Sequence, residues 1–589
     1  MASLSHPPTL TPFLPSSNPV LRRTITFPIP RISCNAANGN DQNTPKPKID
    51  RRDVLIGLTG LYGASTLSQS STFALAAPVQ TPHISKCGPP DLPPGADQTN
   101  CCPPPATSIL DFQPPPPGKL RVRPAAHLAD QNYIEKYKRA VELMKALPDD
   151  DPRNFTQQAN VHCAYCNGAY DQVGFPVEVQ VHNSWLFFPF HRFYLYFHEK
   201  ILGELIGDPS FALPFWNYDA PGGMKMPEMY AEEKSSLYDE LRNQNHLPPR
   251  LVNLDFGGDD PTVTDDAQIR SNLSIMYRQM VSNSSTPSLF FGSAYKAGDE
   301  PSPGGGSVEN IPHGPVHVWC GDNNEPNFEN MGNFYSAARD PIFFAHHSNI
   351  DRFWSIWKTL GGKRQDLRNP EWLDASFIFY NEKSQPVRVR VRDCLDTKTL
   401  GYVYQDVDLP WLRTRPTPRR AQRSSTVANN NILPFGIGPA MAATNPGPSS
   451  SRVRPAKIKF PITLKSAVSV EVKRPKKSRS KKEKEDEEEI LVIYGIGFDP
   501  NQAIKFDVFI NDEDDREIRP DNTEFAGSFV NVPHKHGHKK KVKTGLRLGI
   551  TELLEDLEAD NDDSVIVTLI PRLGAGLFSI DGIKIEFDK

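Results

Sequence analysis

The segments HGPVHVWCGD (residues 313–322) and GNFYSAARDPIFFAHHSNIDRFW (residues 332–354) decide the fold of this chain. The two histidines of the first segment stand four residues apart, so on a helix they share one face and can direct both imidazoles at one metal ion. The second segment has apolar residues at helical spacing and carries the adjacent pair His346 and His347. We therefore expect two helices that bring histidines together.

More histidines lie upstream, in HCAYCNGAYDQ (residues 162–172) and QVHNSWLFFPFHRFYLYFHEK (residues 180–200). Ten of the 15 histidines fall between His127 and His347, among many Trp, Phe and Tyr residues. Histidine rarely fills so aromatic a core unless its polar nitrogens find partners, and a metal is the simplest partner. The sequence predicts two clusters with three ligands each, drawn from His162, His182 and His191, and from His313, His317 and the 346–347 pair.

The types of ligand restrict the choice of metal. Imidazole suits zinc, copper, iron and nickel. The zinc-protease pattern needs a Glu directly after its first His, but Gly314 follows His313. Non-haem iron would require a carboxylate ligand, and none has suitable spacing. Two all-histidine sites favour copper.

These motifs closely resemble the plant polyphenol oxidases, plastid catechol oxidases and tyrosinases with a coupled binuclear type 3 copper centre, along nearly the whole chain. The resemblance implies the first copper ligands His162, His182 and His191, and the second copper ligands His313, His317 and His347. It also implies that His346 is not a ligand. Helical periodicity alone does not separate His346 from His347, because each shares a face with apolar residues.

The expected fold is a mainly α catalytic domain followed by a β-sandwich. The patterns at 133–147 and 186–207 predict an amphipathic and a buried helix, and the resemblance implies that the copper core is a four-helix bundle. The Pro-, Ser- and Arg-rich stretch 413–455 is predicted to be a linker and the site of an activating protease. Beyond it, KIKFPITL, VSVEV, ILVIYGI, IKFDVFI and VIVTLI alternate like strands. The expected domains are therefore catalytic (77–412), linker (413–455) and C-terminal β-sandwich (456–589), which in relatives shields the active site.

Residues 1–76 have the pattern of a two-part targeting signal. The first 40 residues contain no Asp or Glu and are rich in Ser, Thr and Pro, as in a chloroplast transit peptide. Arg51 and Arg52 then precede a short apolar run and Ala74-Leu75-Ala76, which indicates a twin-arginine signal with its cleavage site. The run is too short and too rich in Gly and Ser to span a membrane. We expect delivery to the thylakoid lumen by the twin-arginine translocation machinery.

Four cysteines accompany an N-terminal loop, CGPPDLPPGADQTNCCPPP, that has almost no apolar residues to hold it and needs disulfides. Four cysteines allow three pairings; the resemblance selects Cys87 with Cys102 and Cys101 with Cys163. The resemblance also implies a thioether bond between Cys166 and His182. Cys320 and Cys394 are expected to be buried free thiols.

Other residues near the second copper site acquire roles by the same resemblance. Phe334 matches an aromatic gate over that copper, and Glu309 matches a glutamate that holds a water and helps to deprotonate a phenol. Relatives that hydroxylate monophenols often have Asn after the first ligand, whereas this chain has Gly314, with Val318 after His317. This ranks o-diphenol oxidation ahead of monophenol hydroxylation.

Some charged residues leave alternatives open. Asp351 stands one helical turn after His347, so it could orient a ligand or pair with Arg339 or Arg352. Lys473 to Lys484 is basic and the next five residues are acidic, which predicts a solvated loop. His534, His536 and His538 resemble a metal-binding tract, but without an apolar frame they are expected to form a flexible turn.

The charge balance excludes one class of partner. A net charge of −4 gives no global attraction to nucleic acid or an anionic membrane. We expect small phenols and O₂ as partners, and the oxidation of catechols to o-quinones with reduction of O₂ to water at two copper ions. Two alternatives remain. The same six-histidine centre serves as an oxygen carrier in haemocyanins, and a zinc hydrolase is a third hypothesis. The plant-type CAYC loop and the targeting signal favour the oxidase.

Overall fold

The structure is a computed structural model that describes residues 77–418, 458–512, 519–535 and 541–588. The targeting signal and most of the predicted linker lie outside these residues, as do His536 and His538. Within the described residues, no helix is both long enough and apolar enough to cross a bilayer.

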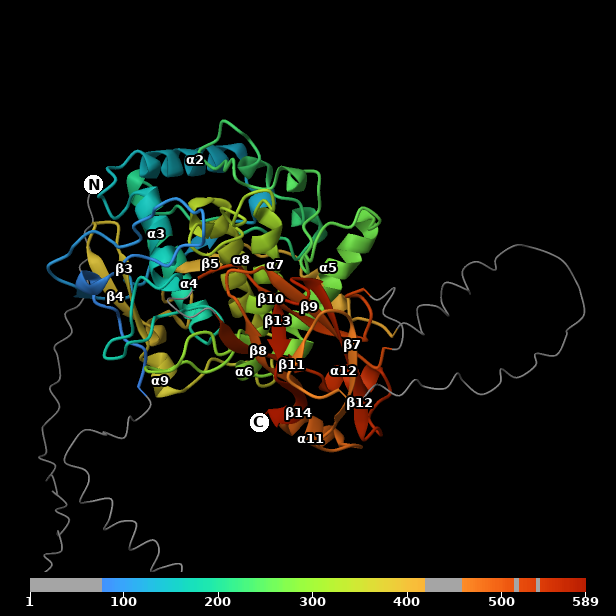
Figure 1. Ribbon diagram of the computed structural model, residues 1–589. Helices are drawn as coiled ribbons and strands as arrows, with labels where there is room; N and C mark the ends of the chain where they lie inside the picture. The colour runs from blue at the N-terminus through green and yellow to red at the C-terminus, as the bar shows by residue number, and fades with distance from the viewer. Residues whose placement is uncertain (1–76, 419–457, 513–518, 536–540, 589) are drawn as a thin grey trace, which may run out of the picture. The chain divides into compact units, whose positions relative to one another are not determined.

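Residues 77–418 are mainly helical (Figure 1). The helices are α2 (Gln131–Lys145), α3 (Phe155–Cys166), α4 (Phe187–Leu205), α5 (Asp265–Met280), α6 (Pro287–Phe291), α7 (Gly314–Cys320), α8 (Ile342–Trp357) and α9 (Pro370–Leu373). A π-helical turn, η7 (Glu309–His313), leads directly into α7. The helices predicted at 133–147 and 186–207 correspond to α2 and α4, each with its bounds displaced by one or two residues.

Helix α2 illustrates how the local sequence sets an element. The Asp130 side chain caps it by accepting a hydrogen bond from the backbone N–H of Tyr133 at 2.8 Å. One stripe of the helix is buried, whereas its other faces are exposed, as its amphipathic pattern predicts. Helices α4 and α8 differ, because they are apolar on nearly every face and are buried around their whole circumference. They pack against each other in the centre of the helical region.

Short strands complete the first region. Strands β1 (Leu110–Asp111), β3 (Ser376–Tyr380) and β4 (Pro386–Arg390) form one small sheet, and β2 (Arg121–Arg123) pairs in parallel with β5 (Tyr402–Tyr404). Two disulfides, Cys87–Cys102 and Cys101–Cys163, fasten the N-terminal loop, and the second ties it to α3. This is the pairing that the resemblance implied.

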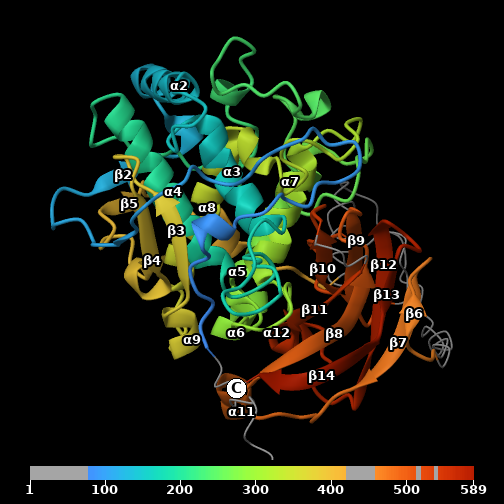
Figure 2. The ribbon, with the colours of Figure 1, turned by 60° about the vertical axis from the view of Figure 1, so that its left-hand side comes forward.

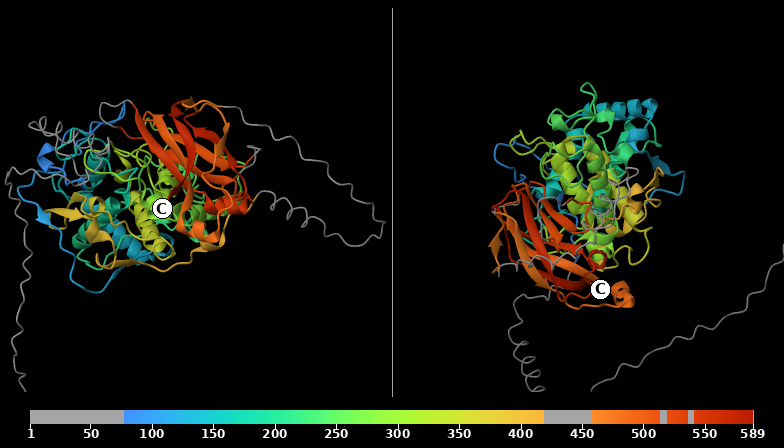
Figure 3. Two further views of the ribbon diagram at one scale, coloured as in Figure 1. Left: turned by 90° about the horizontal axis from the view of Figure 1, so that it is seen from below. Right: turned by 90° about the vertical axis from the view of Figure 1, so that its right-hand side faces the viewer.

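Residues 458–588 form two sheets (Figure 2). One has the order β10 (Phe525–Asn531), β9 (Ile504–Ile510), β12 (Ser564–Leu573), β7 (Val468–Lys473); the other has β11 (Val542–Gly549), β8 (Glu488–Phe498), β13 (Phe578–Ile580), β6 (Ile462–Thr463), with β14 (Gly582–Asp588) paired to β8. All these pairings are antiparallel, and apolar side chains of both sheets share one core. Figure 3 shows these strands, orange to red, from two further sides.

The predicted strands are present, with two differences. KIKFPITL contributes only the two-residue strand β6. The charged segment 473–489 was expected to be a solvated loop, and this is wrong for part of it. It contains helix α11 (Lys481–Asp486) and the start of β8, and the Arg474 guanidinium is buried in a bidentate pair with Glu489 at 2.8 and 2.9 Å. The remaining helix of this region is α12 (Thr551–Asp556).

Polar contacts join the strand-rich region to the helical one. Asn283 Nδ2 donates to the Ala526 carbonyl at 3.0 Å, and the Tyr277 hydroxyl donates to Glu552 at 2.8 Å. Arg415, at the start of the segment predicted to be the linker, forms an ion pair with Asp556 at 2.8 Å. The two regions are therefore held together by contacts as well as by the chain.

Candidate metal centre

Seven histidines gather between the central helices. His162 lies in the last turns of α3, His191 in α4, His313 and His317 at η7 and α7, and His346 and His347 in α8. His182 does not lie on a helix; it is in the segment that precedes α4. All seven are buried, with relative exposures of 2% or less.

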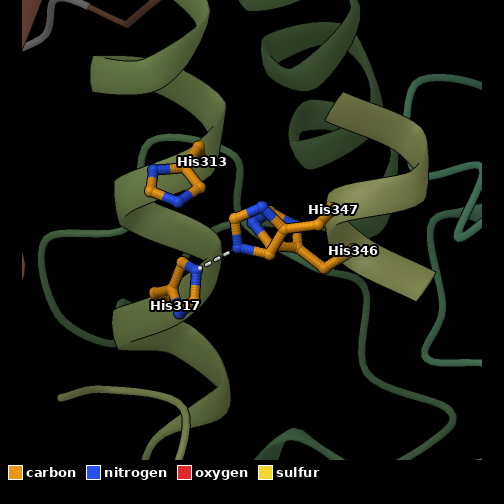
Figure 4. A group of neighbouring side chains, drawn as sticks. All are labelled: His313, His317, His346 and His347. Atoms are coloured by element: carbon orange, nitrogen blue, oxygen red, sulfur yellow. Dashed lines mark hydrogen bonds between the residues drawn. The ribbon is translucent and has the colours of Figure 1, made fainter. Parts of the chain in front are cut away.

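One group consists of His313, His317, His346 and His347, whose ligand atoms all lie within 4.8 Å of one another (Figure 4). His317 donates from Nδ1 to the Met331 carbonyl at 2.7 Å, and His313 donates from Nδ1 to the Glu309 carbonyl at 3.1 Å. The Nε2 atoms of His317 and His347 face each other at 3.2 Å. Two ring nitrogens that point at the same place are better satisfied by binding one cation together than by contacting each other.

A second group surrounds α3 and α4. His162 donates from Nδ1 to the Phe334 carbonyl at 2.7 Å, His191 to the Phe187 carbonyl at 2.8 Å, and His182 to the Gln180 side-chain oxygen at 3.2 Å. Their three Nε2 atoms are buried and have no hydrogen-bond partner among the described residues. Because Nδ1 donates a hydrogen bond, it carries the ring proton and Nε2 keeps a free lone pair. This is the usual arrangement of metal-binding histidines.

The two groups adjoin each other. The rings of His191 and His347 stack at 4.2 Å with an interplanar angle of 13°, and His182 faces His313 at 5.8 Å. The unpartnered Nε2 atoms of His162, His182 and His191 therefore lie beside the cluster that contains His313, His317, His346 and His347. This donor set, all imidazole and without an intervening carboxylate ligand, fits two adjacent copper ions.

Burial keeps these imidazoles neutral. It lowers the pKa of His162 to about 3 and that of His317 to about 4, and together with neighbouring imidazoles it lowers the pKa of His182, His191 and His347 well below the usual value. Neutral imidazole is the form that binds a metal, so no proton competes with the ion near pH 7.

The position of His346 leaves the choice between the neighbours open. Both His346 and His347 belong to the first group, and both have unpartnered ring nitrogens among the described residues. His347 also stacks on His191 of the second group, whereas His346 lies next to the Tyr218 ring at 5.7 Å. Ligation by His347 rather than His346 remains a prediction.

Cys166 lies one turn after His162 on α3 and is buried with a free thiol. Its sulfur and the ligand atoms of His162 and His182 lie within 4.8 Å of one another. Burial, with the Glu309 charge, raises the pKa of this thiol well above its ordinary value. Cys320 and Cys394 are also buried free thiols.

Glu309 is buried beside the metal groups. Its Oε1 accepts a hydrogen bond from the Asn183 backbone N–H at 2.5 Å, and Oε2 has no hydrogen-bond partner among the described residues. Burial raises the pKa of Glu309 to about 8, against the opposing effect of nearby backbone N–H groups. A carboxyl group with one free oxygen at this place can hold a water or accept a proton.

Phe334 covers the group of His162, His182 and His191, whereas the resemblance implied a gate over the other copper. Its ring stacks on His182 at 4.0 Å and, on the other side, on His534 at 4.8 Å. The Phe334 backbone N–H donates to the Pro533 carbonyl at 3.1 Å. The expectation that His534 belongs to a flexible turn is wrong, because its side chain is buried against Phe334 with 1% exposure.

Gly314 is buried under the strand-rich region. A Cβ atom at this position would lie 3.2 Å from Val530 Cγ1 and 3.6 Å from Val532 Cγ2. These two valines belong to the hydrophobic core of the helical region, although they come from β10 and its end. Val318, one turn further along α7, is also buried. Residues 530–534 therefore lie over the two histidine groups.

Asp351 forms neither of the two ion pairs considered from the sequence. Its carboxylate pairs with Arg192 at 2.5 Å and with Arg123 at 3.4 Å, and it accepts hydrogen bonds from the hydroxyls of Tyr402 and Tyr404. Arg352 instead pairs with Asp219 at 3.0 Å. Sequence reasoning missed Arg192, although its place directly after His191 was a usable signal.

Comparison with known families agrees with this geometry. Residues 152–360 match the common central domain of tyrosinase, residues 366–417 the polyphenol oxidase middle domain, and residues 460–587 the chloroplastic polyphenol oxidase C-terminal domain. A chloroplastic polyphenol oxidase of Malus domestica is 60% identical and covers 100% of both chains.

The chain belongs to the polyphenol oxidase family. A chloroplastic polyphenol oxidase of Vitis vinifera is 54% identical over 97% of this chain and 94% of the relative. Among solved structures, latent apple tyrosinase is 61% identical, with a TM-score of 0.75 over 82% of this chain and 100% of that chain. Like its family, this chain is a copper-dependent oxidoreductase that acts on phenols with O₂, and its two histidine groups form the binuclear site.

Proposed function

We propose that this chain is a latent plastid o-diphenol oxidase that converts catechols to o-quinones and reduces O₂ to water. The observation that carries the proposal is the pair of adjoining buried histidine groups, in which several Nε2 atoms have no protein partner among the described residues. Gly314 supports o-diphenols as the main substrates, because it offers no side-chain amide to orient a water on Glu309. Monophenol hydroxylation is then a weak activity.

The proposed ligands are those that the resemblance implied: His162, His182 and His191 for one copper, and His313, His317 and His347 for the other. The copper pair supplies the electron acceptor that couples phenol oxidation to O₂ reduction. The carbonyls that accept from the ring Nδ1 atoms orient the imidazoles. A thioether between Cys166 and His182 would fix the one ligand that no helix carries.

Two residues of the chain act on the substrate in this proposal. Glu309 has a free Oε2, which receives a phenol proton either directly or through a water. Phe334, whose ring already lies against His182, gates the approach to the metals and orients the substrate ring by stacking. We also propose that α3, α4, α7 and α8 act as the four-helix bundle of the copper core.

Latency follows from the residues that lie over the metals. We propose the domain division 77–412, 413–455 and 456–589, with residues 530–534 of the last domain closing the access to the site. Cleavage within 413–455 by a protease would cut the covalent tether that holds this cover near the site. Residues 1–76 would direct the precursor through the stroma to the thylakoid lumen by the twin-arginine route.

The decisive experiment measures oxygen uptake and quinone absorbance of copper-loaded protein, with a catechol and separately with a monophenol, before and after cleavage within 413–455. We expect catechol turnover that rises on cleavage and little turnover of the monophenol. Strong monophenol turnover would contradict our interpretation of Gly314. Reversible O₂ binding without quinone from either form would contradict the oxidase and favour an oxygen carrier.

A further inference from the structure

A row of aromatic rings leads away from the metal groups. It begins at His346 and continues through Tyr218 at 5.7 Å, Trp216 at a further 5.5 Å and Trp319 at a further 6.1 Å, all between ring centroids. The row ends at His246, which stacks on Trp319 at 4.5 Å with an interplanar angle of 3°. Every ring of the row is buried.

The inner end of the row touches the proposed ligands of the second copper. The His346 ring lies 5.5 Å from His313, 4.9 Å from His317 and 5.1 Å from His347. Neither nitrogen of His346 has a hydrogen-bond partner among the described residues. The proposed oxidation of catechols gives this ring no role, although it lies against three ligands.

The outer end of the row lies just beneath the surface. His246 Nε2 lies 3.1 Å from Asp259 Oδ1, and the Asp259 side chain is 48% exposed. The row therefore runs from the copper site to a residue that contacts the solvent-exposed Asp259.

We propose that this row is an electron relay that carries oxidising equivalents from the copper centre to Trp319, where a reductant in solution discharges them. The proposal rests on the proposed function, since copper and O₂ supply the oxidant. Indole and phenol rings are the protein side chains most readily oxidised by one electron, apart from thiols, and rings in contact allow the electron to move in short steps.

The steps balance as one-electron transfers. Trp216 gives one electron through Tyr218 and His346 to the oxidised copper centre, which is reduced by one electron. Trp319 then gives one electron to Trp216 and is left as an indole cation radical that keeps its proton. A catechol or ascorbate at the surface beside Asp259 gives one electron across His246 to Trp319 and is itself oxidised by one electron, which restores the protein.

The cover over the site gives the relay a purpose. Phe334 and residues 530–534 lie over the metals in the uncleaved chain. Oxygen is small enough to enter where a phenol is excluded, so the centre can become oxidised with no substrate to consume the oxidising equivalents. Without a relay, the nearest oxidisable groups are the Cys166 sulfur and the imidazole ligands themselves.

The test uses the full-length, uncleaved protein, loaded with copper and exposed to hydrogen peroxide without any phenol. Peptide mass spectrometry then locates the oxidised side chains. We expect oxidation at Trp319 to appear before oxidation of the histidine ligands, and ascorbate to suppress it. Zinc-loaded protein is the control, because zinc cannot change its oxidation state. Equal oxidation of Trp319 with copper and with zinc would overturn the relay.

Substitutions place the path. In W216F, oxidation of Trp319 should fall several-fold and oxidation of Tyr218 and the ligands should rise; in W319F, oxidation should stop at Trp216. W372F, in a buried tryptophan outside the row, should match the wild type. Unchanged oxidation of Trp319 in W216F would refute the path. If quinone forms from catechol yet Trp319 shows no copper-dependent oxidation, the relay alone fails; if no quinone forms, the proposed function fails.

Discussion

The Arg192 guanidinium donates from Nε to Asp351 Oδ1 at 2.5 Å, and both side chains are buried. Arg192 follows His191 on α4, and Asp351 lies one turn after His347 on α8. The pair thus ties a helix of one histidine group to a helix of the other. Arg192 also lies over the Trp354 ring at 3.6 Å and donates to the Cys394 carbonyl at 2.9 Å, so its position is fixed from several sides.

Removing the Asp351 charge should cost more stability than any exposed ion pair. D351N keeps the shape of the side chain but leaves Arg192 buried without an anion, which we expect to lower the free energy of unfolding by about 3–5 kcal/mol. Denaturant titration measures this change. D111N is the matched control: it breaks the Asp111–Arg388 pair, whose side chains are 60% and 42% exposed, and should cost less than about 1 kcal/mol. Equal losses in both variants would contradict a stabilising role for the buried Arg192–Asp351 pair.

E309Q should slow turnover without loss of copper. Glutamine can still accept the hydrogen bond from the Asn183 N–H but cannot take a proton from a phenol. We expect catechol turnover in the cleaved protein to fall roughly 10²-fold, the size typical of a lost general base, with copper content unchanged by elemental analysis. E325Q, in a partly exposed loop, should behave as the wild type. Full activity in E309Q would remove Glu309 from the mechanism.

G314N should change both selectivity and latency. The added amide can orient a water on Glu309, so the ratio of monophenol to catechol turnover in the cleaved protein should rise. In the uncleaved chain, the new Cβ would meet Val530 at 3.2 Å, and latent activity should increase because the cover is displaced. G314A separates the effects: it shares the steric contact but lacks the amide, so only the latency should change.

H534A should partly activate the uncleaved protein. The variant removes the ring that stacks on Phe334, which frees the gate to move. We expect catechol turnover before cleavage to rise several-fold and turnover after cleavage to stay at the wild-type value. K535A is the control, since the Lys535 ammonium binds the Leu92 carbonyl at 3.1 Å and does not stack on Phe334. If K535A activates as strongly as H534A, loosening of the loop explains the result.

D239N should stabilise the protein at neutral pH. Burial, with the nearby Asp340 charge, raises the pKa of Asp239 from 3.8 to about 6. The folded state therefore binds this proton more tightly than the unfolded state, so the wild type gains stability as the pH falls from about 6 toward 4. Above pH 6 the buried charge costs up to about 3 kcal/mol, which D239N avoids. Unfolding free energies at about pH 7.5, above the raised pKa, and at about pH 4, close to the unfolded pKa of 3.8, should show an advantage that nearly disappears in acid.

The sequence predicted the elements whose information is local. Helices α4 and α8 follow from continuous apolar patterns, and the four-residue spacing of His313 and His317 anticipates their shared cluster. The amphipathic stripe of α2 is equally local. In these segments, the residues that follow the periodic pattern are also the residues that become buried. Tertiary packing therefore agrees with the local preference of the sequence.

Partners far apart in the chain escaped prediction. His534 lies in a polar, lysine-rich stretch, yet its side chain is buried against Phe334, which stands 200 residues earlier in the chain. Asp351 pairs with Arg192 on α4 instead of with Arg339 or Arg352, the arginines near it in the sequence. Likewise, Arg474 was predicted to lie in a solvated loop, but it is buried in an ion pair with Glu489 of β8. In each case the deciding contact crosses between elements, and no local period encodes it.

The polar contacts between the two regions affect what a protease achieves. Cutting the chain within 413–455 removes a covalent tether, but the bonds of Asn283 to Ala526, Tyr277 to Glu552 and Arg415 to Asp556 remain. The cover then stays bound by its own affinity, now as a separate molecule subject to mass action. A nicked enzyme at high concentration would therefore stay largely silent and become active on dilution, so the local concentration in the compartment, as well as the cut, sets the activity.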